Sequence, residues 1–150
     1  MNKIEIGLKR PFPLEQLMFR KGPGGKELVY ITARHQLDRL DNEVGQENWT
    51  TDYHEVMGRV VCNLSLYIAG RWITKSDGAD DTSIEGAKGA LSDALKRAGV
   101  QWGIARVYYY AGAMNGRTPV WWATPEGYYK IRAKQEKMEI EQFKRELGNV

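Results

Sequence analysis

Two adjacent cations, Lys96 and Arg97, stand in the most regular stretch of the chain, residues 84–102. Apolar residues recur there at steps of three and four, which predicts one helix with a buried stripe. The stripe consists of Ile84, Ala87, Leu91, Leu95, Ala98 and Trp102. At about 100° per residue, Lys96 and Arg97 point well away from the stripe, and Lys88 lies at its shoulder. The cations therefore either form a solvated helix face or bind an anion such as a phosphate.

Two further arginines are candidates for the same basic surface. Arg34 begins a second amphipathic stretch, residues 33–44, where it either pairs with Asp38 four residues on or contacts a phosphate. Arg106 precedes three consecutive tyrosines, residues 108–110. A tyrosine run beside a cation can stack nucleic-acid bases, although burial of two of the rings is the commoner arrangement.

The carboxylates and glycines are weaker candidates for chemistry. Asp77, Asp80 and Asp81 share a polar loop that lacks the alternating ligands and final glutamate of a helix–loop–helix calcium site, so we expect no metal. The glycine-rich stretch 21–27 fails the phosphate-loop pattern, because Arg20 stands where a glycine is required. We therefore expect no nucleotide cofactor and no catalytic residue.

Length and composition restrict the class of protein. The 150 residues suffice for one domain with a sizeable core. The sequence contains no run of about 18 apolar residues, so we expect no membrane span. The single cysteine, Cys62, lies in an apolar run and is expected to be buried, which suits a reducing, cytoplasmic location. The net charge of +3 conceals basic segments, residues 1–34 and 82–117, around an acidic one, residues 35–81.

Periodicity and turn signals predict the elements that position these residues. The expected helices are residues 14–21, 33–44, 84–102 and 126–147, and the expected strands are residues 28–32, 48–57, 59–69 and 71–74. The last helix is charged, with Glu126 spaced to pair with Lys130. We expect an α+β fold in which an antiparallel strand meander packs against the long amphipathic helix. Residues 1–117 would form the core domain, and residues 118–150 a C-terminal helical extension of it.

Three pieces of the sequence, in a fixed order, resemble a known family. Residues 30–49 are a strand, an arginine at a helix start and then G-x-x-N-W; the strand meander follows; residues 83–103 open with S-x-E-G-A and continue S-D-A-x-K-R-A. This combination resembles the Rad fifty-two family of single-strand annealing proteins, in a bacterial or phage form. The resemblance covers about half of the chain, residues 28–103.

The resemblance implies both a function and an assembly. The protein would anneal single-stranded DNA without ATP in homologous recombination and double-strand-break repair, and it would not be an enzyme. It would act as a ring or helical homo-oligomer whose outer groove holds the DNA backbone with the bases turned outward. Single-stranded DNA, further copies of the chain and other replication or recombination proteins are the expected partners, and a membrane is not.

The resemblance also suggests which residues bind DNA. In the family picture Lys96 and Arg97 line the groove floor, and Arg34 joins them from the preceding helix, although His35 is almost equally placed. Val100 stands where eukaryotic members carry a further arginine, so other cations would have to supply that charge. The full expected set is Arg34, Lys88, Lys96, Arg97 and Arg106.

Two other functions stay open from the sequence. One is a metal-dependent nuclease that uses Asp77, Asp80, Asp81 or Glu85 together with Lys88, because carboxylates near a lysine suit phosphodiester chemistry. The other is protection of DNA ends without annealing, which would use the same groove. RNA is also an alternative ligand, since contacts to phosphates do not distinguish the sugar.

Overall fold

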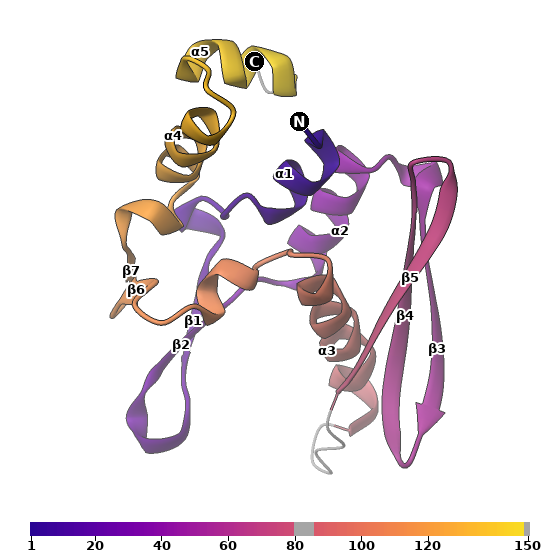
Figure 1. The fold of residues 1–150 in the computed structure, drawn as a ribbon. Helices are drawn as coiled ribbons and strands as arrows, with labels where there is room; N and C mark the ends of the chain where they lie inside the picture. Colours follow the sequence, from indigo (N-terminus) through magenta and orange to yellow (C-terminus); the bar gives the residue numbers. More distant parts are fainter. Residues whose placement is uncertain (80–85, 149–150) are drawn as a thin grey trace. The chain divides into compact units, whose positions relative to one another are not determined.

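A computed structural model describes residues 1–79 and 86–148, except for the side chains of residues 86–88 (Figure 1). The chain divides into two compact units, one of residues Met1–Ile31 with Ala105–Val150 and the other of residues Thr32–Ile104. The α-helices are α1 (Lys3–Lys9), α2 (Ala33–Glu43), α3 (Gly86–Gln101), α4 (Pro125–Gln135) and α5 (Ile140–Leu147). The strands are β1 (Met18–Lys21), β2 (Glu27–Tyr30), β3 (Trp49–Val56), β4 (Arg59–Ile68), β5 (Arg71–Ala79), β6 (Met114–Asn115) and β7 (Thr118–Pro119).

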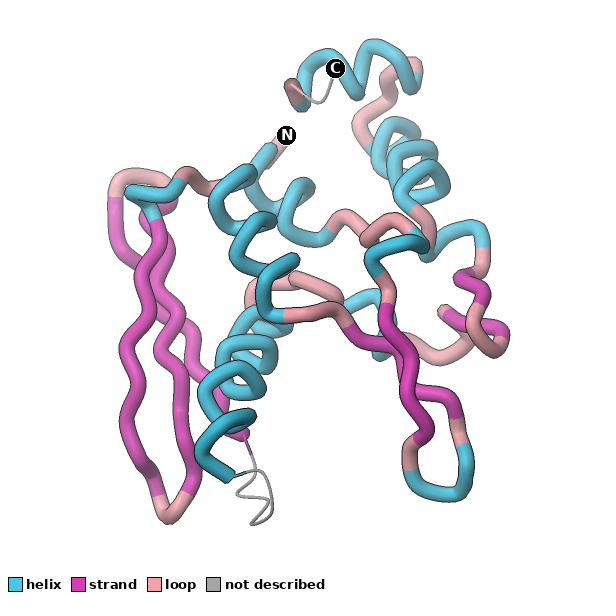
Figure 2. The backbone as a smooth tube through the Cα atoms, turned by 180° about the vertical axis from the view of Figure 1, so that it is seen from behind, coloured by secondary structure: helices cyan, strands magenta, loops and turns pink. Residues whose placement is uncertain are grey.

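The second unit contains the predicted strand meander. Strands β3, β4 and β5 form one antiparallel sheet in chain order, and Figure 2 shows the three strands side by side. Along β4 the alternating residues Cys62, Leu64 and Leu66 are completely buried, because one face of the strand points into the core. The predicted burial of Cys62 is confirmed, and burial raises the pKa of its thiol. The α+β class with an antiparallel sheet is confirmed as well.

Both turns of the meander have left-handed backbone conformations. Met57 and Gly58 connect β3 to β4 with φ of 52° and 80°, and Ala69 and Gly70 connect β4 to β5 with φ of 54° and 81°. Two successive positive φ values match the right-handed twist of the flanking strands. The third strand is longer than predicted and runs to Ala79 instead of ending at Thr74.

Helix α3 covers β4 and β5 on the face of the sheet that holds the core (Figures 1 and 2). Ala94, Leu95 and Ala98 are buried, whereas Leu91 on the same side is 49% exposed. The predicted stripe is thus wrong at Leu91, whereas Ile84 and the side chain of Ala87 lie outside the described residues. Just past the helix end, the indole N–H of Trp102 donates to the carbonyl of Leu64 at 3.1 Å.

Helix α2 packs on α3 through a buried amide. The side chain of Gln36 is 1% exposed and donates to the carbonyl of Leu95 at 2.7 Å. Gly99 makes this approach possible, because a Cβ at that position would lie 2.4 Å from the Gln36 amide nitrogen. A buried hydrogen bond of this kind fixes the two helices relative to one another.

The first unit joins the two ends of the chain. Ile6 of α1, Ala133 of α4 and Phe143 of α5 form one buried cluster, and the hydroxyl of Tyr128 donates to the carbonyl of Ile6 at 2.7 Å. Arg132 also pairs with Glu5 at 3.4 Å. The C-terminal helices are therefore integrated with the N-terminal helix in one folded unit.

The helix predicted over residues 14–21 is wrong. Leu14–Gln16 form one 3₁₀ turn, and Met18–Lys21 form β1, which pairs with β2 in an antiparallel hairpin. The glycines of the intervening loop, Gly24 and Gly25, adopt φ of 73° and 76°, a conformation that glycine supplies at low cost. The pairing of β1 with β2, the next strand along the chain, outweighs its local helical preference.

The single C-terminal helix predicted over residues 126–147 is also wrong, because the chain forms two helices, α4 and α5. The break lies at Lys137, which has a left-handed φ of 57°. The hydrogen bonds of Lys137 N to Lys134 O and of Met138 N to Ala133 O close the end of α4.

Among the described helices, none is both long and apolar enough to cross a membrane.

Candidate nucleic-acid interface

The predicted cation pair lies on the second half of α3. Lys96 and Arg97 are one residue apart, so their side chains leave the helix about 100° apart. The side chain of Arg97 is 54% exposed, and that of Lys96 is 28% exposed. Each cation has a long ion pair to a carboxylate, since Lys96 lies 3.8 Å from Asp93 and Arg97 lies 3.5 Å from Asp77. Such surface pairs contribute little, so a phosphate can replace either carboxylate.

The carboxylate beside Arg97 is held by a network between β5 and α3. Asp77 accepts hydrogen bonds from the backbone N–H of Gly78 at 2.8 Å and from the side-chain amide of Gln101 at 3.2 Å. Burial acts to raise the pKa of Asp77, but these hydrogen bonds and the charge of Arg97 outweigh it and lower the pKa below its ordinary value. Asp77 is therefore ionised at neutral pH and anchors the guanidinium of Arg97.

We expect Asp77→Asn to bind single-stranded DNA about two- to fivefold more tightly at pH 7, because a negative charge beside Arg97 is removed. The free energy of unfolding should fall by about 1 kcal/mol at pH 7, since the bonds to Gln101 and Arg97 lose their charge assistance. Fluorescence anisotropy with a labelled oligonucleotide and urea denaturation measure the two effects. Equal DNA affinities would show that Asp77 does not restrain Arg97.

The same variant has a defined dependence on pH. Because the pKa of Asp77 is lowered in the folded protein, its stabilising contribution is present above the unfolded-state pKa and is lost as the pH falls through the folded pKa. The stability difference between the wild type and Asp77→Asn should therefore shrink towards acidic pH. A difference that stays constant through the acid range would contradict the lowered pKa.

Lys75 on β5 is a further cation near the end of α3, and it was not among the predicted site residues. Its ammonium group lies 4.5 Å from the centre of the Trp102 ring and 3.4 Å from the carbonyl of Gln101. The side chain is exposed on β5. The prediction assigned it to a loop, because no regular alternation of apolar and polar residues continues past Thr74.

Arg34 begins the helix that packs beside α3 and is exposed. Within the described part of the chain, its side chain forms no ion pair, so the alternative pair with Asp38 is not formed. The neighbouring His35 is half-buried, and its ring nitrogen Nδ1 lies 3.2 Å from the hydroxyl of Thr32, the N-cap residue of α2. Of the two, Arg34 is the side chain that is available to a ligand in solution.

The other two predicted contacts are less defined. Lys88 belongs to the first turn of α3, but its side chain lies outside the described residues. Arg106 is half-buried at the start of a 3₁₀ turn, residues Arg106–Tyr109, and falls in the first unit, whereas Arg34, Lys96 and Arg97 fall in the second. Lys96, Arg97 and Lys75 thus belong to the second unit, where Lys75 contacts the carbonyl of Gln101 and Arg97 contacts Asp77, the partner of the Gln101 side chain.

The tyrosine run is more exposed than expected. The hydroxyl of Tyr108 accepts a hydrogen bond from the backbone N–H of Phe12 at 2.8 Å, and the ring is half-buried. Tyr109 is 74% exposed and Tyr110 is 55% exposed. The expectation of two buried rings is therefore wrong, because only Tyr108 has a partner to order it within the unit.

The carboxylates of the nuclease alternative find no support as a group. Asp77 is occupied by Arg97 and Gln101, as described above. Asp80, Asp81 and Glu85 lie outside the described residues. In the part of the chain that the structure describes, no three histidine, cysteine or acidic side chains cluster as metal ligands would.

Comparison with known proteins gives consistent results. Residues 1–115 match the family described as the Rad52/22 family of double-strand break repair proteins. A protein named single-stranded DNA-binding protein DdrA from Deinococcus radiodurans is 29% identical over 117 residues, which cover 73% of this chain and 56% of that protein. The protein of the same name from Deinococcus deserti is 29% identical over 117 residues, which cover 73% of this chain and 58% of that one. The chain thus spans little more than half the length of these relatives.

Proposed function

Because the chain belongs to the Rad52/22 family of double-strand break repair proteins, we propose that it binds single-stranded DNA and anneals complementary strands in recombination and repair. One observation carries the proposal: α3, backed by a sheet and by α2, carries the exposed Arg97 and the partly exposed Lys96, and Lys75 is exposed on the neighbouring strand β5. The name of the DdrA relatives supports single-stranded DNA as the ligand.

The mechanism that we propose is electrostatic and needs no nucleotide hydrolysis. Two DNA strands repel one another through their phosphates, and cations on a rigid surface reduce that repulsion. The ion pairs to Asp77 and Asp93 keep the cationic side chains oriented and are weak enough to be exchanged for phosphates. Contacts to the backbone alone leave the base edges free to find a complementary strand.

We further propose that several copies act together as a ring or helical assembly. Two or three cations in one copy give weak binding, whereas repeated sites along one DNA strand add through effective concentration.

We also propose a location in the cytoplasm. The buried, free Cys62 suits an intracellular protein.

We expect the purified protein to accelerate the pairing of complementary oligonucleotides without ATP. The rate of duplex formation, followed by energy transfer between two dyes, should rise at least tenfold over the spontaneous rate at low salt and fall as salt is added, because the effect depends on phosphate neutralisation. Light scattering should give a mass well above 17.1 kDa.

The same samples separate the alternatives. Tight binding without faster pairing would favour end protection, and cleavage of the labelled strand with magnesium or manganese would favour a nuclease. Equal rates of duplex formation with RNA and DNA oligonucleotides would show that the protein does not distinguish ribose from deoxyribose. A protein that remains a monomer and does not bind single strands would contradict the proposed function.

A further inference from the structure

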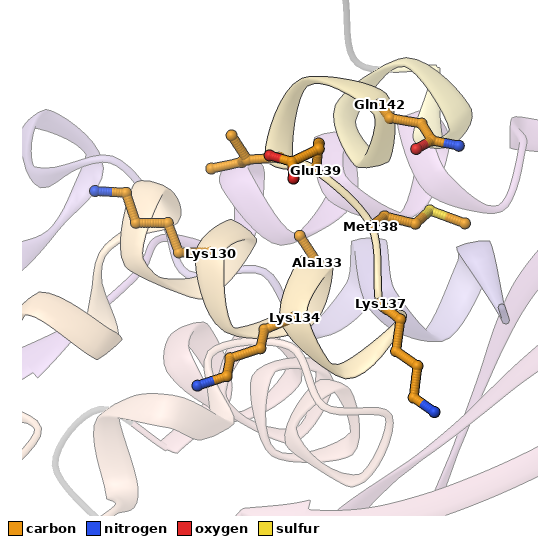
Figure 3. Close-up of a pocket in the computed structure, with 8 residues that line it drawn as sticks. Lys130, Ala133, Lys134, Lys137, Met138, Glu139 and Gln142 are labelled. Carbon is orange, nitrogen blue, oxygen red and sulfur yellow. The ribbon is translucent and has the colours of Figure 1, made fainter.

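A second group of lysines lies at the junction of α4 and α5, in the part of the chain beyond the family match. Lys130, Lys134 and Lys137 line an open pocket of about 470 Å³ (Figure 3). We propose that this lysine rim binds the phosphate backbone of single-stranded nucleic acid, as a phosphate-binding surface separate from that of α3. The identity of the ligand rests on the proposed function, whereas the grouping of the three lysines is seen in the structure itself.

Among the described residues, no carboxylate pairs with the lysines of the rim. All three lysine side chains are exposed, and none of them forms an ion pair with another described residue. Lys130 was expected to pair with Glu126, but Glu126 pairs instead with Lys144 at 3.2 Å. The lining contains a single acidic residue, Glu139. A pocket lined by three lysines and one carboxylate attracts anions.

The backbone of Lys137 is a second, independent observation. Lys137 occupies the left-handed position that follows the end of α4, where the bonds of Lys137 N to Lys134 O and of Met138 N to Ala133 O form a Schellman motif. Glycine is favoured at this position because a Cβ is unfavourable there. Helix α5 of the same unit ends on a glycine, Gly148, in the same conformation. The chain thus keeps a lysine where glycine would be more stable, which indicates a use for its charge.

The arrangement of the lysines favours an extended polyanion. Figure 3 shows the three side chains pointing in different directions, so their ammonium groups do not converge on one small anion. Met138 and Ile140, which are half-buried, line the same pocket and add apolar surface to it. A nucleic-acid strand offers both features, with phosphates at intervals and apolar sugar and base surfaces between them.

The test uses one substitution with opposite effects on stability and binding. We expect Lys137→Gly to raise the melting temperature by about 2–4 °C, since strain at the left-handed position is relieved. The same variant should bind a labelled oligothymidine several-fold more weakly, and the slope of log K against log salt should be about 0.7 smaller. Lys130→Ala, Lys134→Ala and Lys137→Gly combined should reduce the slope by about 2.

Controls distinguish failure of the rim from failure of the proposed function. Lys3→Ala removes an exposed cation from the same unit and should leave DNA binding unchanged. Unchanged binding by the triple variant, together with weaker binding by an α3 variant, would overturn the rim and leave the proposed function intact. A wild-type protein that does not bind oligothymidine would overturn both. If the triple variant no longer bound polyglutamate but still bound DNA as the wild type does, the rim would be a site for acidic protein segments. That result would overturn the nucleic-acid proposal.

Discussion

The double variant Lys96→Ala, Arg97→Ala should bind single-stranded DNA about 10- to 100-fold more weakly than the wild type at low salt. A charge-assisted hydrogen bond to a phosphate contributes about 1.5–3 kcal/mol in favourable cases, and partial exposure of both side chains lowers each contact to about 0.7–1.4 kcal/mol. The slope of log K against log salt should fall by about 1.4, because two phosphate contacts are removed. Anisotropy titrations at four or five salt concentrations measure both quantities.

The fold should survive this change. Arg97 lies 3.5 Å from Asp77 and Lys96 lies 3.8 Å from Asp93, and surface pairs of this kind contribute less than about 1 kcal/mol. Alanine also has the highest helix propensity. The melting temperature of the double variant should therefore stay within a few degrees of the wild type, so weaker binding would not reflect unfolding.

The carboxylate that pairs with Lys96 provides a matched control. Asp93→Asn removes the partner of Lys96 and should strengthen DNA binding slightly, whereas the double variant weakens it. Identical salt slopes for the wild type and the double variant would remove α3 from the interface. In that case the exposed Lys75 and Arg34 would be the next residues to test.

Much of the second unit could be predicted because its signals are local. The alternation of buried residues in β4 and the paired positive-φ turns around it are visible in adjacent residues, and both sheet connections are tight. The helix start at Thr32 is equally local, since the cap is bonded within three residues. These elements were therefore predicted close to their observed positions.

The first unit depends on contacts between distant segments, and there the prediction was poorer. Residues 18–21 are an exception, because they form a strand by pairing with β2, the next strand along the chain. The break at Lys137 carries no glycine or proline to signal it, and the buried Phe143 and Ile6 are what position α5. Local propensity cannot reveal elements that long-range packing selects.

The site divides in the same way. The position of Lys96 and Arg97 outside the buried stripe of the helix follows from the sequence period alone. Their carboxylate partners do not, because Asp77 lies on a strand 20 residues away from Arg97. Lys75 was missed because the length of β5 is decided by its pairing with β4, which continues to Ala79.

The substitution with the largest expected effect on stability is Phe143→Ala. Phe143 is fully buried in the cluster with Ile6 and Ala133, and its ring meets that of Tyr129 edge to face at 6.3 Å between centroids. Truncation leaves a cavity and should lower the free energy of unfolding by about 3–5 kcal/mol. Urea denaturation followed by tryptophan fluorescence measures the loss.

Two controls make this result interpretable. Phe143→Leu keeps most of the volume and should cost less than about 1.5 kcal/mol, and Glu141→Ala on the exposed side of α5 should change stability by less than about 0.5 kcal/mol. A Phe143→Ala protein as stable as the Glu141→Ala control would mean that α5 is only loosely attached. A loss of several kcal/mol would instead show that the C-terminal helices, which lie beyond the family match, are part of the folded core with α1, and so form a stable support for the lysine rim.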